Sequence, residues 1–119
     1  ADLPAVAAAV VGLAAGENLA VRIYEELRGC RDFGLKDQMT RAAVSIASNI
    51  AEGAERDTKP EFIRFLHISK GSAAELRTQV LIAGRIGILA EPAKTDIVEE
   101  LVRVSSMIHG LIKSLKRSS

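Results

Sequence analysis

The sequence contains no tryptophan and only one cysteine, and aromatic residues make up 3% of its 119 positions. Because the lone Cys30 cannot form an intramolecular disulfide, the chain lacks the cysteine framework of small secreted domains, and we expect a cytoplasmic protein. Hydrophobic residues nevertheless make up 48% of the sequence. With so few aromatic residues, the core must consist of alanine, valine, leucine and isoleucine. This composition predicts a globular, helical protein.

A large charge excess and a long hydrophobic run are also missing. Sixteen Lys and Arg residues stand against fifteen Asp and Glu residues, which leaves a formal net charge of +1. Any site for nucleic acid must therefore arise from a local arrangement of basic residues. The longest apolar run, Ala5 to Ala15, is about half of the ~20 residues that a membrane span needs, and no basic residue precedes it as in a signal peptide. It predicts a soluble helix and no membrane partner.

Helix start and stop signals divide the chain into four expected helices. The first begins at Asp2-Leu3-Pro4 and runs to about Arg28, the second spans Leu35 to about Glu55, the third runs from the capping box Thr58-Lys59-Pro60-Glu61 to about Ile86, and the fourth begins at Glu91-Pro92. No run of period-two alternation predicts a strand. The expected fold is all-α, an antiparallel up-down-up-down four-helix bundle that forms a single domain over residues 1–119.

Apolar residues at helical spacing predict the buried faces. The first helix carries Leu13, Gly16, Ala20, Ile23 and Leu27; the third carries Phe62, Phe65, Leu66, Ser69, Ala73, Leu76, Val80 and Ala83; the fourth carries Ile97, Leu101, Val104, Ile108, Leu111 and Leu115. The small residues from Gly71 to Ala74 predict a close helix contact.

The second helix is apolar around most of its circumference. Met39, Ala42, Ala43, Ile46 and Ile50 form its broad face, which Val44, Ala47 and Ala51 extend. Such a helix should be buried nearly all round, which a small bundle alone does not provide. Together with Ile63, Leu81 and Ile82, which we expect to face away from the bundle seam, this pattern predicts a homo-oligomer.

No constellation of residues predicts catalysis. His67 and His109 lie on different helices without further ligands at metal spacing, Cys30 has no histidine partner, and Gly53 and Gly71 are isolated glycines in helices rather than a phosphate-binding loop. We therefore expect a protein that is not an enzyme, with no metal and no cofactor.

Two polar features remain as candidate sites. A narrow stripe on the second helix, formed by Gln38, Ser45, Asn49 and Glu52, suits either an outside ligand or a hydrogen-bond network within the assembly. The third helix carries a basic face of Arg64, His67, Lys70, Arg77 and Arg85, which suits phosphate contacts, although the interleaved aliphatic residues suit a protein surface. The basic residues Lys113, Lys116 and Arg117 suit the C-terminal end of a helix dipole.

Three stretches carry a resemblance to a known family: FGLKDQ (residues 33–38), RAAVSIASNIAEG (41–53) and EFIRFLHISKGSAAEL (61–76). They resemble the four-helix-bundle proteins encoded by intervening sequences of bacterial 23S ribosomal RNA genes, relatives of the accessory variability protein of diversity-generating retroelements. NLAVRIYEEL (18–27) is similar to the end of the family's first helix.

The resemblance implies a homopentameric ring without known catalytic activity, and a basic surface for nucleic acid that includes the matched Arg41 and Arg56. Ala47 replaces a usual proline, Thr40 replaces an arginine that often precedes Arg41, and Ala54-Glu55 replace an aromatic residue and a glycine before Arg56. The expected function is a homo-oligomeric bundle that binds RNA or DNA. The alternative is a scaffold that binds another protein.

Overall fold

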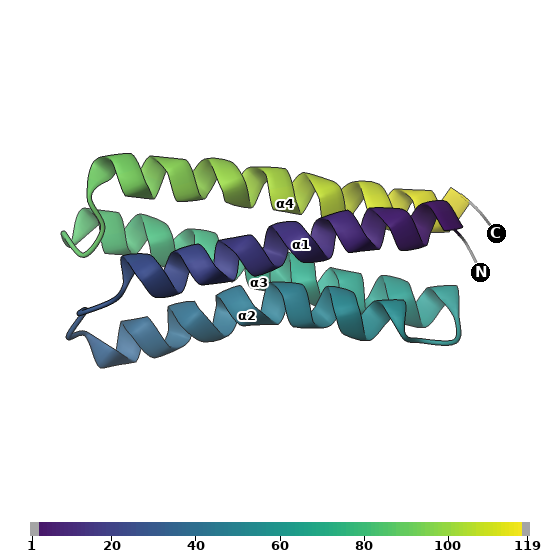
Figure 1. Cartoon of the computed structure of the whole chain (residues 1–119), viewed down its shortest axis with the longest axis horizontal. Helices are drawn as coiled ribbons and strands as arrows, with labels where there is room; N and C mark the ends of the chain where they lie inside the picture. Colours follow the sequence, from purple (N-terminus) through teal and green to yellow (C-terminus); the bar gives the residue numbers. More distant parts are fainter. Residues whose placement is uncertain (1–2, 118–119) are drawn as a thin grey trace.

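Four α-helices account for most of the chain in the computed structural model, which describes residues 3–117. They are α1 (Leu3–Glu26), α2 (Phe33–Ala54), α3 (Lys59–Arg85) and α4 (Glu91–Arg117). Consecutive helices run in opposite directions and form an elongated body of 47 × 22 × 18 Å (Figure 1). Both α1 and α3 pack against α2 and α4, and no strand occurs between residues 3 and 117. The predicted all-α, up-down-up-down bundle is therefore confirmed.

Local capping interactions fix the helix starts. Thr58 is in an extended conformation, and its side chain accepts a hydrogen bond from the Glu61 N–H at 3.3 Å. This is the capping interaction that the sequence predicted for α3. The Asp32 side chain accepts from the Leu35 N–H at 3.1 Å, so α2 begins two residues before the predicted Leu35. The predicted cap Asp2 lies outside the described residues.

Glycines with positive φ end two of the helices. Gly29, with φ of 84°, follows α1, and Gly87, with φ of 83°, follows α3. Residues with a side chain rarely adopt this conformation, whereas glycine does so without steric cost. After Gly87, the Ile88 and Leu89 N–H groups both donate to the Ala83 carbonyl, at 2.9 and 3.2 Å. The chain thereby turns tightly into α4.

The core is aliphatic, as the composition predicts, but the buried line on α1 differs from the predicted one. Leu19 is fully buried, whereas Leu13 and Ala20 are half-buried. Small residues extend the buried line of α1 toward the N-terminus; its members are Ala5, Ala9, Gly12, Gly16, Leu19 and Ile23. Both the predicted and the observed buried faces of α1 have residues spaced three and four apart, so spacing alone does not distinguish them. Contact with α2 and α4 decides which face is buried.

The predicted core stripes of α3 and α4 are buried except at Phe65, which is half-buried. The buried stripes also include Gln79 on α3 and Ile112 on α4, which the pattern did not single out. Ile63, expected to face outward, instead packs against the core. Leu81 and Ile82 are exposed, as expected.

Close helix contact occurs on α2, and the prediction that Gly71 provides it is wrong. Gly71 is exposed, and a Cβ added there would meet nothing within 4 Å. A Cβ on Gly53 would instead lie 2.9 Å from Phe62 Cδ1, and one on Gly16 would lie 3.3 Å from Ala47 Cα. The buried Ser69 hydroxyl also donates to the Ile46 carbonyl at 2.7 Å. The helix pairs α1–α2 and α2–α3 therefore depend on small residues at their contacts.

A salt bridge joins α1 to α4. Arg22 donates to Asp96 at 2.7 Å and to Glu26 at 3.1 Å. The hydrogen bond to Asp96 is the main cause that raises the pKa of the Arg22 guanidinium above its ordinary value. Arg22 therefore keeps its positive charge throughout the physiological pH range.

α1 is long and apolar enough to cross a membrane by length and composition alone, with a mean hydropathy of 1.5 over its most apolar window. The core helices of soluble proteins pass the same test. Only 28% of that window is buried by the other helices. Much of α1 is therefore an apolar surface, and the expectation of no membrane partner stays a prediction.

Candidate nucleic-acid interface

A basic groove runs between α3 and α4. Lys70 and Arg77 are separated by seven residues, which is two helical turns, so they lie on the same side of α3. That side faces α4, because Lys70 Nζ lies 3.2 Å from Nδ1 of His109. Lysine has only donors to offer, so His109 Nδ1 is the acceptor in this contact and orients the ammonium group.

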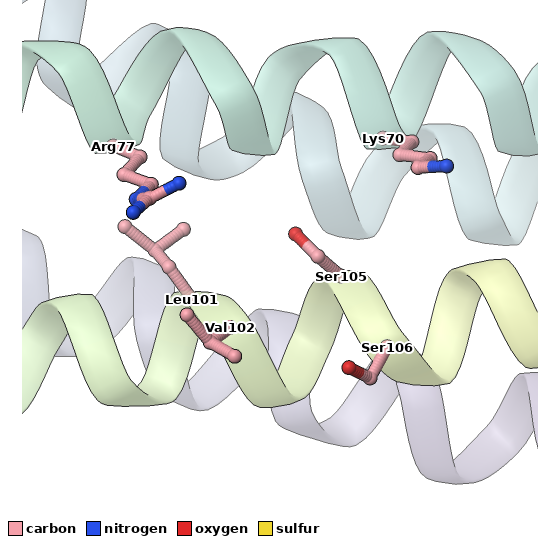
Figure 2. A pocket seen from close by; sticks show the side chains of 6 residues that line it. All are labelled: Lys70, Arg77, Leu101, Val102, Ser105 and Ser106. Carbon is pink, nitrogen blue, oxygen red and sulfur yellow. The ribbon is translucent and has the colours of Figure 1, made fainter.

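The groove is lined by Lys70, Arg77, Leu101, Val102, Ser105 and Ser106 and has a volume of about 310 Å³. Figure 2 shows Arg77 and Lys70 reaching from α3, with the Ser105 hydroxyl directed toward α3 between their positions. No carboxylate is among the lining residues, so nothing within the groove neutralises its two cations. Leu101 and Val102 add apolar surface from α4.

Three of the other predicted basic residues are already neutralised by neighbouring carboxylates. Arg41 pairs with Asp37 at 2.9 Å, Arg56 with Glu52 at 2.8 Å, and Arg64 with Glu61 at 2.9 Å. In contrast, Lys70, Arg77 and Arg85 form no ion pair with any residue between positions 3 and 117. The six candidates therefore form two groups, one paired with carboxylates and one without an ion pair in the described chain.

Arg56 and Arg64 have a further structural role at the α2–α3 hairpin. Their guanidinium carbons lie 4.6 and 4.5 Å from the centre of the Phe65 ring. Such cation–π contacts are each worth ~0.5–1 kcal/mol at an exposed site. Both guanidinium groups thus contact the Phe65 ring, and these contacts hold the two arginines at the α2–α3 hairpin.

Arg85 lies apart from the groove, in the last turn of α3. Lys116 and Arg117 likewise lie in the last turn of α4. Cations at these positions interact favourably with the negative end of the helix dipole, at ~0.3–1 kcal/mol each. They remain exposed, so the same charges are also open to an external anion.

Some residues of the polar stripe of α2 form hydrogen bonds within the chain, and others are exposed to solvent. Asn49 Nδ2 donates to the Ser45 carbonyl at 2.8 Å and to Ser45 Oγ at 2.9 Å. Ser45 Oγ in turn lies 2.8 Å from Ser72 Oγ on α3. Glu52 is engaged by Arg56, and Gln38 is exposed. Ser45 and Asn49 therefore connect α2 to α3 within one chain.

A second groove, between α1 and α2, is mainly apolar. Its central part has a volume of about 480 Å³ and is lined by Leu13, Glu17, Ala20, Val21, Val44, Ala47, Ser48 and Ala51. It continues past Tyr24 and Arg41 on one side and past Val6 and Val10 on the other. Val21 and Val44 are 58% and 42% exposed. Of the predicted extension of the apolar face of α2, Val44 is thus left exposed and Ala51 half-exposed, whereas Ala47 is buried against Gly16 of α1.

The remaining candidates bring no reactive groups together. Within residues 3–117, no three His, Cys, Asp or Glu side chains gather as metal ligands would. Cys30 is half-buried after the end of α1, and its thiol donates a weak hydrogen bond to the Asp32 carbonyl at 3.8 Å. The contributions of Ser105, Ser106 and His109 to the basic groove were missed, because they depend on how α3 and α4 align.

These observations define a class: an antiparallel four-helix bundle with a basic groove on one side and a mainly apolar groove on another. Residues 13–110 match the family of the 23S rRNA-intervening sequence protein. The chain belongs to this family, as the resemblance indicated.

A solved structure has the same fold. It is a protein of unknown function from the S23 ribosomal protein family of Bacteroides thetaiotaomicron, 23% identical in sequence, with a TM-score of 0.81. The similarity covers 86% of this chain and 98% of that one. Comparison with curated proteins finds no match.

Proposed function

We propose that this protein is a self-associating helical bundle without catalytic activity, which binds nucleic acid in the cytoplasm through its α3–α4 face. The separation of charge on its surface carries the proposal. Lys70 and Arg77 form no ion pair in the described chain and line a groove without carboxylates, whereas Arg41, Arg56 and Arg64 are paired elsewhere. Membership of a family described by a 23S rRNA intervening sequence supports RNA as one ligand.

Self-association is the first part of the proposal. Burial of one aliphatic side chain contributes ~1.5–3 kcal/mol, against an association cost of ~4–15 kcal/mol. The exposed Val6, Val10, Val21 and Val44, with the partly exposed Ala51, supply apolar surface along the α1–α2 groove, and each further copy in a ring adds the same surface again to offset that cost. The family resemblance favours five copies. Since each chain has a net charge of only +1, a ring would also multiply the basic face into a multivalent surface.

The test of self-association compares two substitutions of similar exposure. We expect sedimentation to give an oligomer at micromolar concentration, and Val44→Glu to dissociate it because a carboxylate would be buried in the groove. Ile82→Glu is the matched control, since Ile82 is 47% exposed against 42% for Val44 but lies on α3. A folded ~13 kDa wild-type monomer would refute self-association. Dissociation by Ile82→Glu alone would refute the α1–α2 groove as the interface.

The test of nucleic-acid binding compares basic residues that form no ion pair in the described chain with arginines that are paired with carboxylates. We expect labelled single- or double-stranded RNA or DNA to bind at ~50 mM salt, with log K falling by ~0.7–0.9 per neutralised phosphate as log salt rises. The Arg77→Gln/Arg85→Gln double variant should weaken binding and flatten this slope. The Arg41→Gln/Arg64→Gln variant also removes two positive charges, but from arginines that are paired with carboxylates. It should weaken binding much less. Absence of salt-sensitive binding to any of these nucleic acids would refute this part of the proposal.

A protein-binding scaffold is the second candidate, and the α1–α2 groove favours it. The groove is lined mainly by alanine, valine and leucine and is continuous along the bundle. The basic groove, moreover, has no aromatic side chain on which bases could stack. This function is preferred if the wild-type oligomer binds no nucleic acid.

A further inference from the structure

The α3–α4 groove has the features of a track for a sugar–phosphate backbone. Its two cations are seven residues apart on α3, which corresponds to ~10.5 Å along the helix axis. Neighbouring phosphates of one strand are closer together than this. Lys70 and Arg77 therefore have the spacing to contact two different phosphates of one strand that lies along the groove.

The α4 side of the groove supplies hydroxyl donors between these cations. Ser105 and Ser106 line the groove, and neither hydroxyl forms a hydrogen bond to another described residue. Serine hydroxyls commonly donate to phosphate oxygens. The Ser105 hydroxyl is directed toward α3 between Arg77 and Lys70 (Figure 2), where an intervening phosphate of the same strand would lie.

His109 fixes one end of this track. Its Nδ1 accepts from Lys70 Nζ at 3.2 Å, which limits the freedom of a flexible lysine and lowers the entropic cost of using it. The apolar side chains Leu101 and Val102 border the track where the sugars of a strand would pass. None of the lining residues presents a flat ring or an amide to a base edge, so the groove offers recognition of backbone rather than of sequence.

We infer that the α3–α4 groove binds the backbone of one nucleic-acid strand, with Lys70 and Arg77 contacting two different phosphates of that strand and Ser105 and Ser106 donating hydrogen bonds between them. This inference rests on the proposed function and adds the mode of binding: which part of the nucleic acid the groove contacts and which hydroxyl groups take part. The ligand class is a run of phosphodiesters, read without sequence preference.

The first test places a carboxylate in the track. Ser105→Asp puts a negative charge between Lys70 and Arg77, and we expect it to weaken binding of a labelled 20-nucleotide oligo-dU or oligo-dT by at least about tenfold, because like charges repel at close range. Asn18→Asp is the matched control. It adds the same charge to an exposed position on α1, away from the groove, and should change affinity by less than about twofold.

The second test removes hydroxyls without changing charge. Ser105→Ala/Ser106→Ala should weaken binding by about 2- to 10-fold, the value of one or two hydrogen bonds. The slope of log K against log salt should stay as in the wild type, because no cation is lost. Lys70→Gln/Arg77→Gln should lower both the affinity and the slope. Sedimentation and circular dichroism of each variant verify the fold and assembly.

Each outcome separates this inference from the proposed function. If the wild type binds the oligonucleotide and Ser105→Asp binds as tightly as Asn18→Asp, the groove assignment is wrong while nucleic-acid binding stands. If inorganic phosphate or pyrophosphate displaces the oligonucleotide at micromolar concentration, the groove is a site for free phosphates and the strand track is wrong. If the wild type binds no nucleic acid, both the groove assignment and the proposed nucleic-acid binding are refuted.

Discussion

Replacement of two helical glycines by alanine tests how α2 and α3 pack. Both Gly71 and Gly53 lie inside helices, where alanine is favoured over glycine by ~0.5–1 kcal/mol. At Gly71 the new Cβ meets nothing within 4 Å, so this gain is realised in full. At Gly53 it would lie 2.9 Å from Phe62 Cδ1, 3.0 Å from Phe65 Cβ and 3.2 Å from the Phe62 carbonyl oxygen. Overpacking of this kind costs ~1–3 kcal/mol, and Gly53 is in the last turn of α2, where the propensity gain is smallest.

Thermal unfolding followed by circular dichroism measures both effects. An unfolding entropy of ~2.1 cal/mol/K per residue, taken over the whole chain, means that 1 kcal/mol shifts Tm by about 4 °C. We expect Gly71→Ala to raise Tm by about 2–4 °C and Gly53→Ala to lower it by up to about 8 °C. The variants must be compared at equal protein concentration, because the Tm of an oligomer depends on it.

Two results would refute this reasoning. A Gly53→Ala variant as stable as Gly71→Ala would mean that Phe62 moves aside without cost, so that the α2–α3 contact is looser than the structure shows. A lower Tm for Gly71→Ala would mean that this face of α3 is covered in the assembled protein, and the α1–α2 groove would then not be the sole interface.

Three further substitutions and one control have expected effects on stability, each measured by chemical denaturation. Ser69→Ala removes the buried hydrogen bond to the Ile46 carbonyl and should cost ~0.5–1.5 kcal/mol, whereas Thr78→Ala, whose exposed hydroxyl bonds within its own helix, should cost little. Thr58→Ala removes the N-cap of α3 and should cost ~0.5–2 kcal/mol; an unchanged midpoint would show that Pro60 alone fixes the helix start. Asp96→Asn breaks the exposed ion pair with Arg22 and should cost no more than ~1 kcal/mol, less at high salt.

The helix boundaries were largely predictable, because they depend on residues that act locally. Thr58 accepts from an N–H three residues away, and Gly29 and Gly87 take backbone conformations that suit glycine. None of these interactions requires a partner helix. α2 begins two residues before the expected Leu35 because the Asp32 side chain caps it.

The candidate site was less predictable, because it depends on how helices align. The basic side of α3 is visible in the sequence, but the contact of Lys70 with His109 joins residues 39 positions apart. Likewise, spacing alone does not show that Gly71 faces outward while Gly53 meets Phe62. A pattern of period 3.6 defines faces of a helix, but it leaves open which neighbour each face meets. The pairing of Arg41 and Arg64 at i±3 and i±4 was available in the sequence and separates them from Lys70 and Arg77.

The position of Tyr24 has a practical consequence for the study of assembly. It is the single tyrosine of a chain without tryptophan, it is 51% exposed, and it lines the α1–α2 groove beside Thr40 and Val44. Its emission therefore dominates the intrinsic fluorescence of the whole molecule and originates at the surface where copies are proposed to meet. A dilution series monitored by acrylamide quenching of this one ring would yield the association constant directly, with no dye or tag attached.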